Sequence, residues 1–219
     1  MNKDEQWYFP PDKNLKVPEK LKKAIIYFED RQFYYHFGIN PVSIFKSFTE
    51  NIVQRKVVRG GSTITMQVAR MSEPKNRNYF NKIKEIFLAI KIELWNSKEN
   101  ILQMYVDNAP YGGNIIGYQA ASLRYYQKSP EQLTWGEACT LAVLPNAPGL
   151  ISPISNKNIL INKRNNLLKT LLKENILDQE TYKLSILEPI PSKLNKIELI
   201  APHLSQELKD KVSKDYSII

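Results

Sequence analysis

The chain has 219 residues, 42% of them hydrophobic and 24% charged, which is typical of a globular protein built around one sizeable domain. Its formal net charge of +9 favours an anionic partner, such as nucleic acid, anionic lipid or a phosphorylated substrate, with a merely lysine-rich composition as the competing explanation. The one cysteine, Cys139, excludes an internal disulfide and lies in the apolar run CTLAVL, where we expect a small core residue.

Two further features of the composition narrow the class of protein. The two histidines occur without CxxC or HExxH spacing, which argues against a structural zinc site. No apolar run is long enough to span a membrane, and the N-terminal residues MNKDEQWYFP lack the features of a signal peptide. We therefore expect a chain that is soluble or lies on a surface, and its proline-rich start is typical of a segment of a longer protein.

The first predicted helix covers residues 21–28 and leads into an acidic pair, Glu29 and Asp30, within the aromatic stretch AIIYFEDRQFYYHFGIN. A carboxylate among aromatic side chains is desolvated, so we expect its pKa to rise unless it is paired. The simpler alternative is a surface glutamate at a helix end, with Arg31 as its partner. The stretch alone does not decide between them.

Residues 41–58 combine apolar residues at helical spacing with a basic flank that includes Lys46, Arg55 and Arg59. Such a helix either faces a core or lies on a membrane surface. The sequence RGGSTITMQVAR follows, in which Gly60 and Gly61 break the chain and Ser62 or Thr63 can cap a helix. Backbone and hydroxyl donors at a helix start are typical of an oxyanion or phosphate site, but also of an ordinary loop.

Residues 81–95, NKIKEIFLAIKIELW, give the clearest helical pattern, with apolar stripes on two opposite sides. A helix of this kind is expected to be central and covered by neighbours on both faces. Glu85 falls on the second stripe, beside Leu88 and Ala89, so we expect its carboxylate to point into a packed region. The alternative is an exposed glutamate that is stabilised by the dipole of the first helical turn.

The rest of the chain also reads as helical, so the predicted fold class is mainly α. Ser97 is expected to cap a helix that runs to about residue 108, and a further helix is expected over 117–126. Thr134 and Glu137 match a capping box that opens a helix ended by Pro145. Two more helices are predicted over 158–174 and 179–186, and the tail from Pro189 has no clear pattern.

Five segments, taken together and in order, resemble the motifs of the peptidoglycan glycosyltransferase domain found in penicillin-binding proteins and monofunctional transglycosylases. EDRQFYYHFGIN resembles EDxxFxxHxGxD, RGGSTITMQVAR resembles GGSTITQQ, and NKIKE resembles RKxxE. SKENILQMYVDNAPYGGNIIG is similar to a motif built on ILxxYLNxxYxG, and LAVLPNAP to A-x-LPxxP. The five cover roughly residues 20–153, and MQVAR with NAPYGG is most similar to the penicillin-binding protein 1C branch.

The resemblance implies a lysozyme-like helical domain with a smaller membrane-facing jaw at about residues 41–60. It divides the chain into an N-terminal segment 1–19, a glycosyltransferase core 20–155, and a C-terminal helical part 156–219 leading toward a transpeptidase domain. It implies a transferase of cell-wall biogenesis that polymerises lipid II into β-1,4 glycan strands by inverting displacement of undecaprenyl pyrophosphate. The enzyme would act at the outer face of the bacterial cytoplasmic membrane and use a divalent metal, Mg or Mn.

The implied partners are lipid II, the growing glycan strand, a membrane surface met by residues 42–59, and a complex of cell-wall synthesis proteins, but no nucleic acid. By motif position, Glu29 is the general base, and Glu85 is the second catalytic carboxylate, reaching the metal through the pyrophosphate. Six residues are implied in substrate binding: Ser62, Thr63, Gln67, Arg70, Arg77 and Lys82. Five are implied in ordering the loops near the site: Asp30, Arg31, His36, Gly60 and Gly61.

The chain departs from the family pattern at three positions. Met66 stands for the first glutamine of the usual pair, Asn81 for the arginine of RKxxE, and Asn40 for an aspartate. These changes bear on the rate and on the pyrophosphate contacts. Two other functions remain open at this stage: a lysozyme-like glycan hydrolase with one catalytic glutamate, and a non-catalytic domain that binds the lipid-linked precursor as a scaffold.

Overall fold

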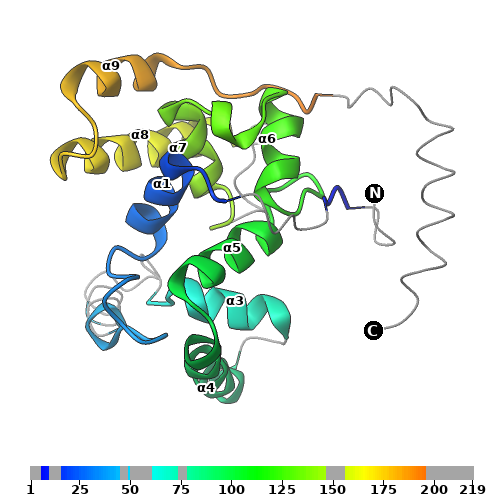
Figure 1. The fold of residues 1–219 in the computed structure, drawn as a ribbon. Helices are drawn as coiled ribbons and strands as arrows, with labels where there is room; N and C mark the ends of the chain where they lie inside the picture. The colour runs from blue at the N-terminus through cyan, green and yellow to red at the C-terminus, as the bar shows by residue number, and fades with distance from the viewer. Residues whose placement is uncertain are drawn as a thin grey trace, which may run out of the picture.

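The computed structural model describes residues 6–9, 16–44, 49, 61–73, 78–146 and 156–195. Within these ranges the chain forms helices and no strand, with isolated bridges from Trp7 to Ile115 and from Pro110 to Ile116, so the mainly α prediction is confirmed (Figure 1). The helices are α1 Glu19–Glu29, α3 Ile64–Ser72, α4 Tyr79–Trp95, α5 Lys98–Asn108, α6 Tyr118–Tyr126, η1 Pro130–Gln132, α7 Trp135–Val143, α8 Lys157–Lys173 and α9 Gln179–Leu187.

Helix α7 is the centre of the upper group of helices in Figure 1, where α1, α6, α8 and α9 all pack against it. Its sequence is rich in small residues, which lets neighbouring helices approach it closely. Leu141 and Cys139 are fully buried, which confirms the expected core position of the cysteine. At Gly136 an added Cβ would lie 2.9 Å from the Ser185 carbonyl oxygen, so α9 can pack this closely only against glycine.

Helix starts follow the capping residues expected from the sequence. The Thr134 hydroxyl accepts a hydrogen bond from the Glu137 N–H at 3.2 Å, and the Glu137 carboxylate accepts one from the Thr134 N–H at 2.9 Å. Ser97 caps α5 by accepting from the Asn100 N–H at 3.2 Å. Both predicted caps are confirmed, because each hydroxyl satisfies an N–H that has no partner within its own helix.

A second group of helices, α3, α4 and α5, lies below the first, and α5 runs up toward α6 (Figure 1). Helix α3 packs on both α4 and α5. Its buried face includes Ile64, Thr65, Met66, Val68 and Ala69. This small helix therefore links the peripheral α4 to the body of the molecule.

The prediction that residues 81–95 form a central helix covered on both faces is wrong. Helix α4 buries Ala89 against α3, but Ile83, Phe87 and Leu94 on another face are 52%, 69% and 67% exposed. The helix does have two apolar faces, but none of the described residues covers the face that carries Ile83, Phe87 and Leu94. None of the described helices is long and apolar enough to cross a membrane.

The loop that follows α1, residues 31–40, is held against α4 at Gly38. This residue has a φ of +77°, and a Cβ added to it would lie 3.0 Å from the Ala89 carbonyl oxygen. Only glycine combines this backbone conformation with so close an approach. The loop that begins at the acidic pair is thereby fixed against both α3 and α4.

The exposed face of α4 leads to a stability prediction. We expect Phe87→Ser to change the free energy of unfolding by less than about 0.5 kcal/mol, as is usual for an exposed position. Leu141→Ala in the buried α7 should instead cost roughly 2–5 kcal/mol. Urea unfolding of both variants measures the difference, and a cost near that of Leu141→Ala for Phe87→Ser would contradict the exposed face.

Candidate active site

Glu29 is the last residue of α1, at the point where the chain turns into the loop. Its Oε2 atom accepts a hydrogen bond from the Gln67 side-chain amide at 2.7 Å. Its Oε1 atom is buried and accepts no hydrogen bond from any described residue. One of the two carboxylate oxygens is therefore buried without a hydrogen-bond donor among the described residues, which is costly for an ionised group.

The pKa of Glu29 is raised above its ordinary value, as the sequence predicted. Desolvation by burial is the main cause, and the Gln67 hydrogen bond and the charge of Lys163 oppose it. The flanking aromatics divide: Phe33 is fully buried, whereas Tyr35 and Phe37 are 89% and 52% exposed and do not enclose the carboxylate. Groups on three other helices also interact with Glu29, namely Gln67 on α3, Tyr105 on α5 and Lys163 on α8.

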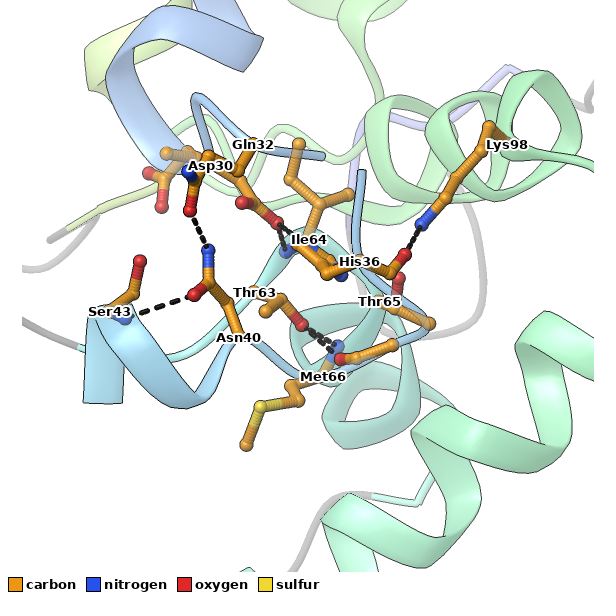
Figure 2. A network of polar contacts seen from close by, with 12 residues as sticks. Asp30, Gln32, His36, Asn40, Ser43, Thr63, Ile64, Thr65, Met66 and Lys98 are labelled. Carbon is orange, nitrogen blue, oxygen red and sulfur yellow. Dashed lines mark hydrogen bonds and ion pairs between the residues drawn. The ribbon is translucent and has the colours of Figure 1, made fainter. Parts of the chain in front are cut away.

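Asp30, the second residue of the acidic pair, holds the loop together. Its Oδ2 atom accepts from the Ile64 N–H at 3.1 Å and lies 2.8 Å from Nε2 of His36 (Figure 2). The Thr63 hydroxyl donates to the Gly38 carbonyl at 2.6 Å. These contacts join the loop after α1 to the first turn of α3, in keeping with the loop-ordering roles expected for Asp30 and His36.

Other positions singled out in the sequence have local roles. Arg31 is exposed and pairs with Glu174 at the end of α8, at 3.6 Å. Asn40, where the family pattern has aspartate, accepts from the Ser43 N–H at 3.0 Å and so caps the turn that follows. Gly61 directly precedes Ser62, whereas Gly60 lies outside the described residues.

Glu85 is the centre of a cationic cluster on the inner side of α4. Its Oε1 atom accepts from Lys82 Nζ at 2.6 Å and from Arg70 Nη2 at 2.9 Å, and its Oε2 atom accepts from Arg70 Nε at 3.0 Å. Ser62 joins the cluster, since its hydroxyl accepts from Arg70 at 3.2 Å and from Lys82 at 2.8 Å. Three predicted substrate-binding residues thus converge on the second glutamate.

The cluster shifts the pKa of Glu85 in the opposite direction to that of Glu29. Burial alone would raise its pKa, but the hydrogen bonds and charges of Arg70 and Lys82 outweigh burial and lower it. The Glu85 side chain is only 10% exposed, whereas those of Arg70 and Lys82 are 36% and 40% exposed. The cations therefore present a net positive surface to solvent, with an ionised carboxylate behind them.

Helix α3 brings the two glutamates into one site. Gln67, which binds Glu29, and Arg70, which binds Glu85, are three residues apart and so lie on the same face of this helix. The charge of Arg70 also acts on Glu29. Both carboxylates therefore flank a single face, and they do not turn to opposite surfaces of the molecule.

Two predicted substrate-binding residues, Thr63 and Arg77, remain to be placed relative to this face. Thr63 is 2% exposed, and its hydroxyl donates to the Gly38 carbonyl and accepts from the Met66 N–H. This buried hydroxyl is therefore engaged within the protein and is poorly placed for the predicted contact with substrate. Arg77 lies outside the described residues. Met66 is fully buried beside Ala69 and Ala89, so the exchange of glutamine for methionine adds an apolar residue to an apolar contact.

Sequence reasoning missed two residues near Glu29. Lys163 on α8 carries a charge that lowers the pKa of Glu29, and its Nζ donates to the Asn146 side chain at 2.6 Å. Desolvation lowers the pKa of Lys163 itself. Tyr105 on α5 is fully buried, and burial together with the charge of Glu29 raises the pKa of its hydroxyl. The sequence predicts the helix over 158–174 that carries Lys163, but it does not indicate that this helix lies beside Glu29.

The described side chains near Glu85 do not form a set of ligands for the predicted divalent metal. Among the described residues, no group of three histidine, cysteine, aspartate or glutamate side chains is arranged to hold a metal ion. Glu85 is the one carboxylate in the cationic cluster, and both its oxygens already accept from Arg70 or Lys82. These residues do not fit a resident metal site.

The chain belongs to the transglycosylase family, whose model matches residues 6–172. It is 35% identical over 209 residues to penicillin-binding protein 1C of Escherichia coli, which covers 95% of this chain and 27% of that protein. It is 36% identical to penicillin-binding protein 1A of Aquifex aeolicus, covering 81% of this chain and 25% of that one. The family resemblance read from the five motifs is confirmed, and the chain spans about a quarter of the length of these relatives.

The two glutamates should affect stability with opposite signs. The pKa of Glu29 is higher in the folded state than in the unfolded state. Between these two pKa values the folded protein binds more protons than the unfolded chain, and above both values the ionised Glu29 destabilises the folded state. Glu29→Gln should therefore stabilise the protein at pH 7.5. Glu85 has a lowered pKa and stabilises the fold when ionised, so Glu85→Gln should destabilise it at pH 7.5.

Denaturant unfolding at pH 7.5 and at pH 3 measures both effects. Below the pKa of each group the carboxyl is protonated in both states, so the difference from the wild type should shrink as the pH falls. Equal signs for the two variants at pH 7.5 would show that the two carboxylates do not have opposed environments.

Proposed function

We propose that this domain is a peptidoglycan glycosyltransferase that polymerises lipid II into β-1,4-linked glycan strands. The observation that carries the proposal is the pair of glutamates on one face of α3, with Glu29 raised in pKa and Glu85 ionised behind two cations. Two carboxylates whose pKa values are pushed apart have distinct tasks in a reaction that moves a proton and expels an anion. Membership of the transglycosylase family supports the same reaction.

Glu29 is suited to be the general base. The acceptor sugar hydroxyl is a weak nucleophile, and a carboxylate with a pKa raised toward neutrality accepts its proton effectively as the new bond forms. The hydroxyl oxygen then attacks the anomeric carbon of the donor, and the bond from that carbon to the pyrophosphate breaks. Its electron pair leaves with the pyrophosphate, the proton stays on Glu29, and the α configuration becomes β.

Arg70, Lys82 and Ser62 are suited to bind the departing pyrophosphate. The exposed parts of the two cations face solvent beside Glu85, and fixed positive charge stabilises an anion that develops in the transition state. Glu85 holds the two cations in place through three hydrogen bonds. Asn81 stands where the family pattern has an arginine. Among the described residues, the positive charge that would stabilise the pyrophosphate therefore comes mainly from Arg70 and Lys82.

A divalent ion remains part of the proposal as a companion of the substrate. The protein groups here favour a pyrophosphate oxygen over a bare metal ion, because arginine and lysine surround the one carboxylate. An Mg or Mn ion would therefore arrive bound to the pyrophosphate and supply further charge neutralisation to it. Arg70 and Lys82 would contact the same group from the protein side.

The membrane surface belongs to the same proposal, because the substrate is lipid-linked. Residues 45–48 and 50–59 of the predicted membrane segment 42–59 lie outside the described residues, while Val42 and Ile44 are 56% and 39% exposed. The outer face of α4 adds an exposed stripe of apolar and basic residues, which is typical of a helix at a membrane interface. The stripe consists of Phe80, Ile83, Lys84, Phe87, Lys91 and Leu94.

The exposed stripe supports a proposed location at the outer face of the cytoplasmic membrane, where lipid II would be polymerised in the proposed reaction. Anionic headgroups would meet Lys84 and Lys91, and the acyl region would meet the apolar side chains between them. The inner face of the same helix carries Lys82 and Glu85. Cell-wall synthesis proteins remain proposed partners.

The direct test is strand synthesis from labelled lipid II, followed on a gel, with divalent metal and with chelator. Glu29→Gln should reduce the rate to less than about a hundredth of the wild-type rate, since a general base contributes 10²–10⁴-fold. Arg31→Gln, at an exposed position, is the matched control and should retain activity. Near-normal synthesis by Glu29→Gln would remove Glu29 from the mechanism.

The same assay separates the two other functions. A glycan hydrolase would release muropeptides from preformed strands, but the cationic cluster beside Glu85 has no use with a neutral sugar leaving group. A scaffold domain would bind a donor-site inhibitor of the moenomycin type without turning over lipid II. Either outcome with folded wild-type protein would overturn the proposed function.

Vesicle co-sedimentation tests the membrane surface. We expect the double variant Ile83→Ser/Phe87→Ser to bind anionic vesicles at least about fivefold more weakly than the wild type, because it removes exposed apolar area from the outer face of α4. The matched control is Leu184→Ser/Leu187→Ser on α9, where the side chains are 61% and 78% exposed. Equal losses for both double variants, or none for the first, would contradict a specific role for α4.

A further inference from the structure

A buried ion pair lies where α4 ends and α5 begins, outside the residues discussed so far. Lys98 Nζ donates to Glu93 Oε1 at 2.7 Å, and the two side chains are 17% and 4% exposed. Lys98 also lies over the ring of Phe33, 4.6 Å from its centroid.

The pair makes two more contacts, and each reaches a different element. Glu93 Oε1 also accepts from the Thr65 hydroxyl at 2.6 Å, and Thr65 is fully buried in α3. Lys98 Nζ also donates to the backbone carbonyl of His36, at 2.7 Å, in the loop after α1 (Figure 2). One cluster of four residues thus ties α3, α4, the start of α5 and the loop together.

Each of these elements carries part of the candidate active site. The loop begins directly after Glu29, and α3 carries Gln67 and Arg70 within two turns of Thr65. Helix α4 carries Glu85 two turns before Glu93. The cluster therefore lies behind the site and joins the segment that holds the base to the segments that hold the cations.

Stability alone is a weak reason for such a pair. Taking two charges out of water costs free energy that their attraction only partly returns, and apolar residues of similar size often serve stability as well or better. A buried pair with hydrogen bonds in fixed directions does, however, select one arrangement of the segments that it joins. The hydrogen bond between Glu93 and Lys98, and the two that they make with Thr65 and the His36 carbonyl, fit that second role.

We propose that Glu93 and Lys98 are positioning residues that set the separation between the base Glu29 and the cationic cluster of Glu85. The proposal rests on the proposed glycosyltransferase function. Neither residue touches substrate, and each acts through the loop, α3 and α4. Because a displacement of about 1 Å in a catalytic group can cost about 10²-fold in rate, a small shift of the loop against α4 is enough to matter.

The test is steady-state kinetics of Lys98→Met, which keeps the length of the side chain and removes its charge and donors. We expect kcat per folded molecule to fall at least tenfold while KM for lipid II changes less than about threefold, because Arg70, Lys82 and Ser62 still bind the pyrophosphate. Lys98→Arg can donate to both Glu93 and the His36 carbonyl, so it should recover most of kcat.

The matched control is Lys128→Met. Lys128 follows α6 and pairs with Glu137 on α7 at 2.8 Å, and neither helix carries a residue of the candidate site, so its loss should affect stability without lowering kcat per folded molecule. Activities are compared at a temperature where circular dichroism shows every variant folded. An equal fall in kcat for Lys98→Met and Lys128→Met would overturn the positioning role, as would full activity of Lys98→Met.

Amide hydrogen exchange supplies a readout that needs no activity. Lys98→Met should speed exchange in residues 31–40 and in the first turn of α3, and leave α7 and α8 at the wild-type rate. Unchanged exchange in the loop would overturn the proposal even if the wild type is active. An inactive wild type with the expected exchange pattern would instead count against the proposed function alone.

Discussion

The structure of the site depends on one turn of α3. Gln67 and Arg70 are three residues apart, and one binds Glu29 while the other binds Glu85. The two glutamates come from segments separated by more than fifty residues, so only a third element can fix their relative position. The Thr63 cap and the Asp30 contact to the Ile64 N–H secure the start of that helix, and the loop after α1 is held by the same contacts.

The same arrangement explains why two identical side chains behave differently. Glu29 receives one hydrogen bond and leaves one oxygen unsatisfied, so desolvation dominates and its pKa rises. Glu85 receives three hydrogen bonds from two cations, so pairing dominates and its pKa falls. Burial is common to both, and the number and charge of the donors decide the sign. A base and an anion-binding cluster thus arise from the same residue type within one site.

Local signals in the sequence were enough for the helices and for much of the site. Ser97 and Thr134 were correctly predicted as caps because capping needs only a hydroxyl and an N–H three residues away. The raised pKa of Glu29 was also expected, although two of the aromatic residues expected to enclose it, Tyr35 and Phe37, are exposed. The effect of Lys163 on Glu29 and the contacts of Glu93 and Lys98 to Thr65 and His36 could not be predicted, because these residues are distant in sequence and periodicity says nothing about which helices meet.

The sequence predicted a central helix over 81–95 because α4 has two apolar faces, and the exposure of one of them has a physical explanation. A helix with two apolar sides needs two apolar neighbours, and one of these can be a lipid surface in place of protein. In the proposed reaction the donor is a pyrophosphate joined to a long hydrocarbon chain. Lys82, held by Glu85 on the inner side of α4, would meet the pyrophosphate, and the exposed Ile83 and Phe87 on the outer side would meet the hydrocarbon of the membrane. A single helix with both kinds of face would therefore place the charged site at the depth where the pyrophosphate of a membrane-bound donor lies.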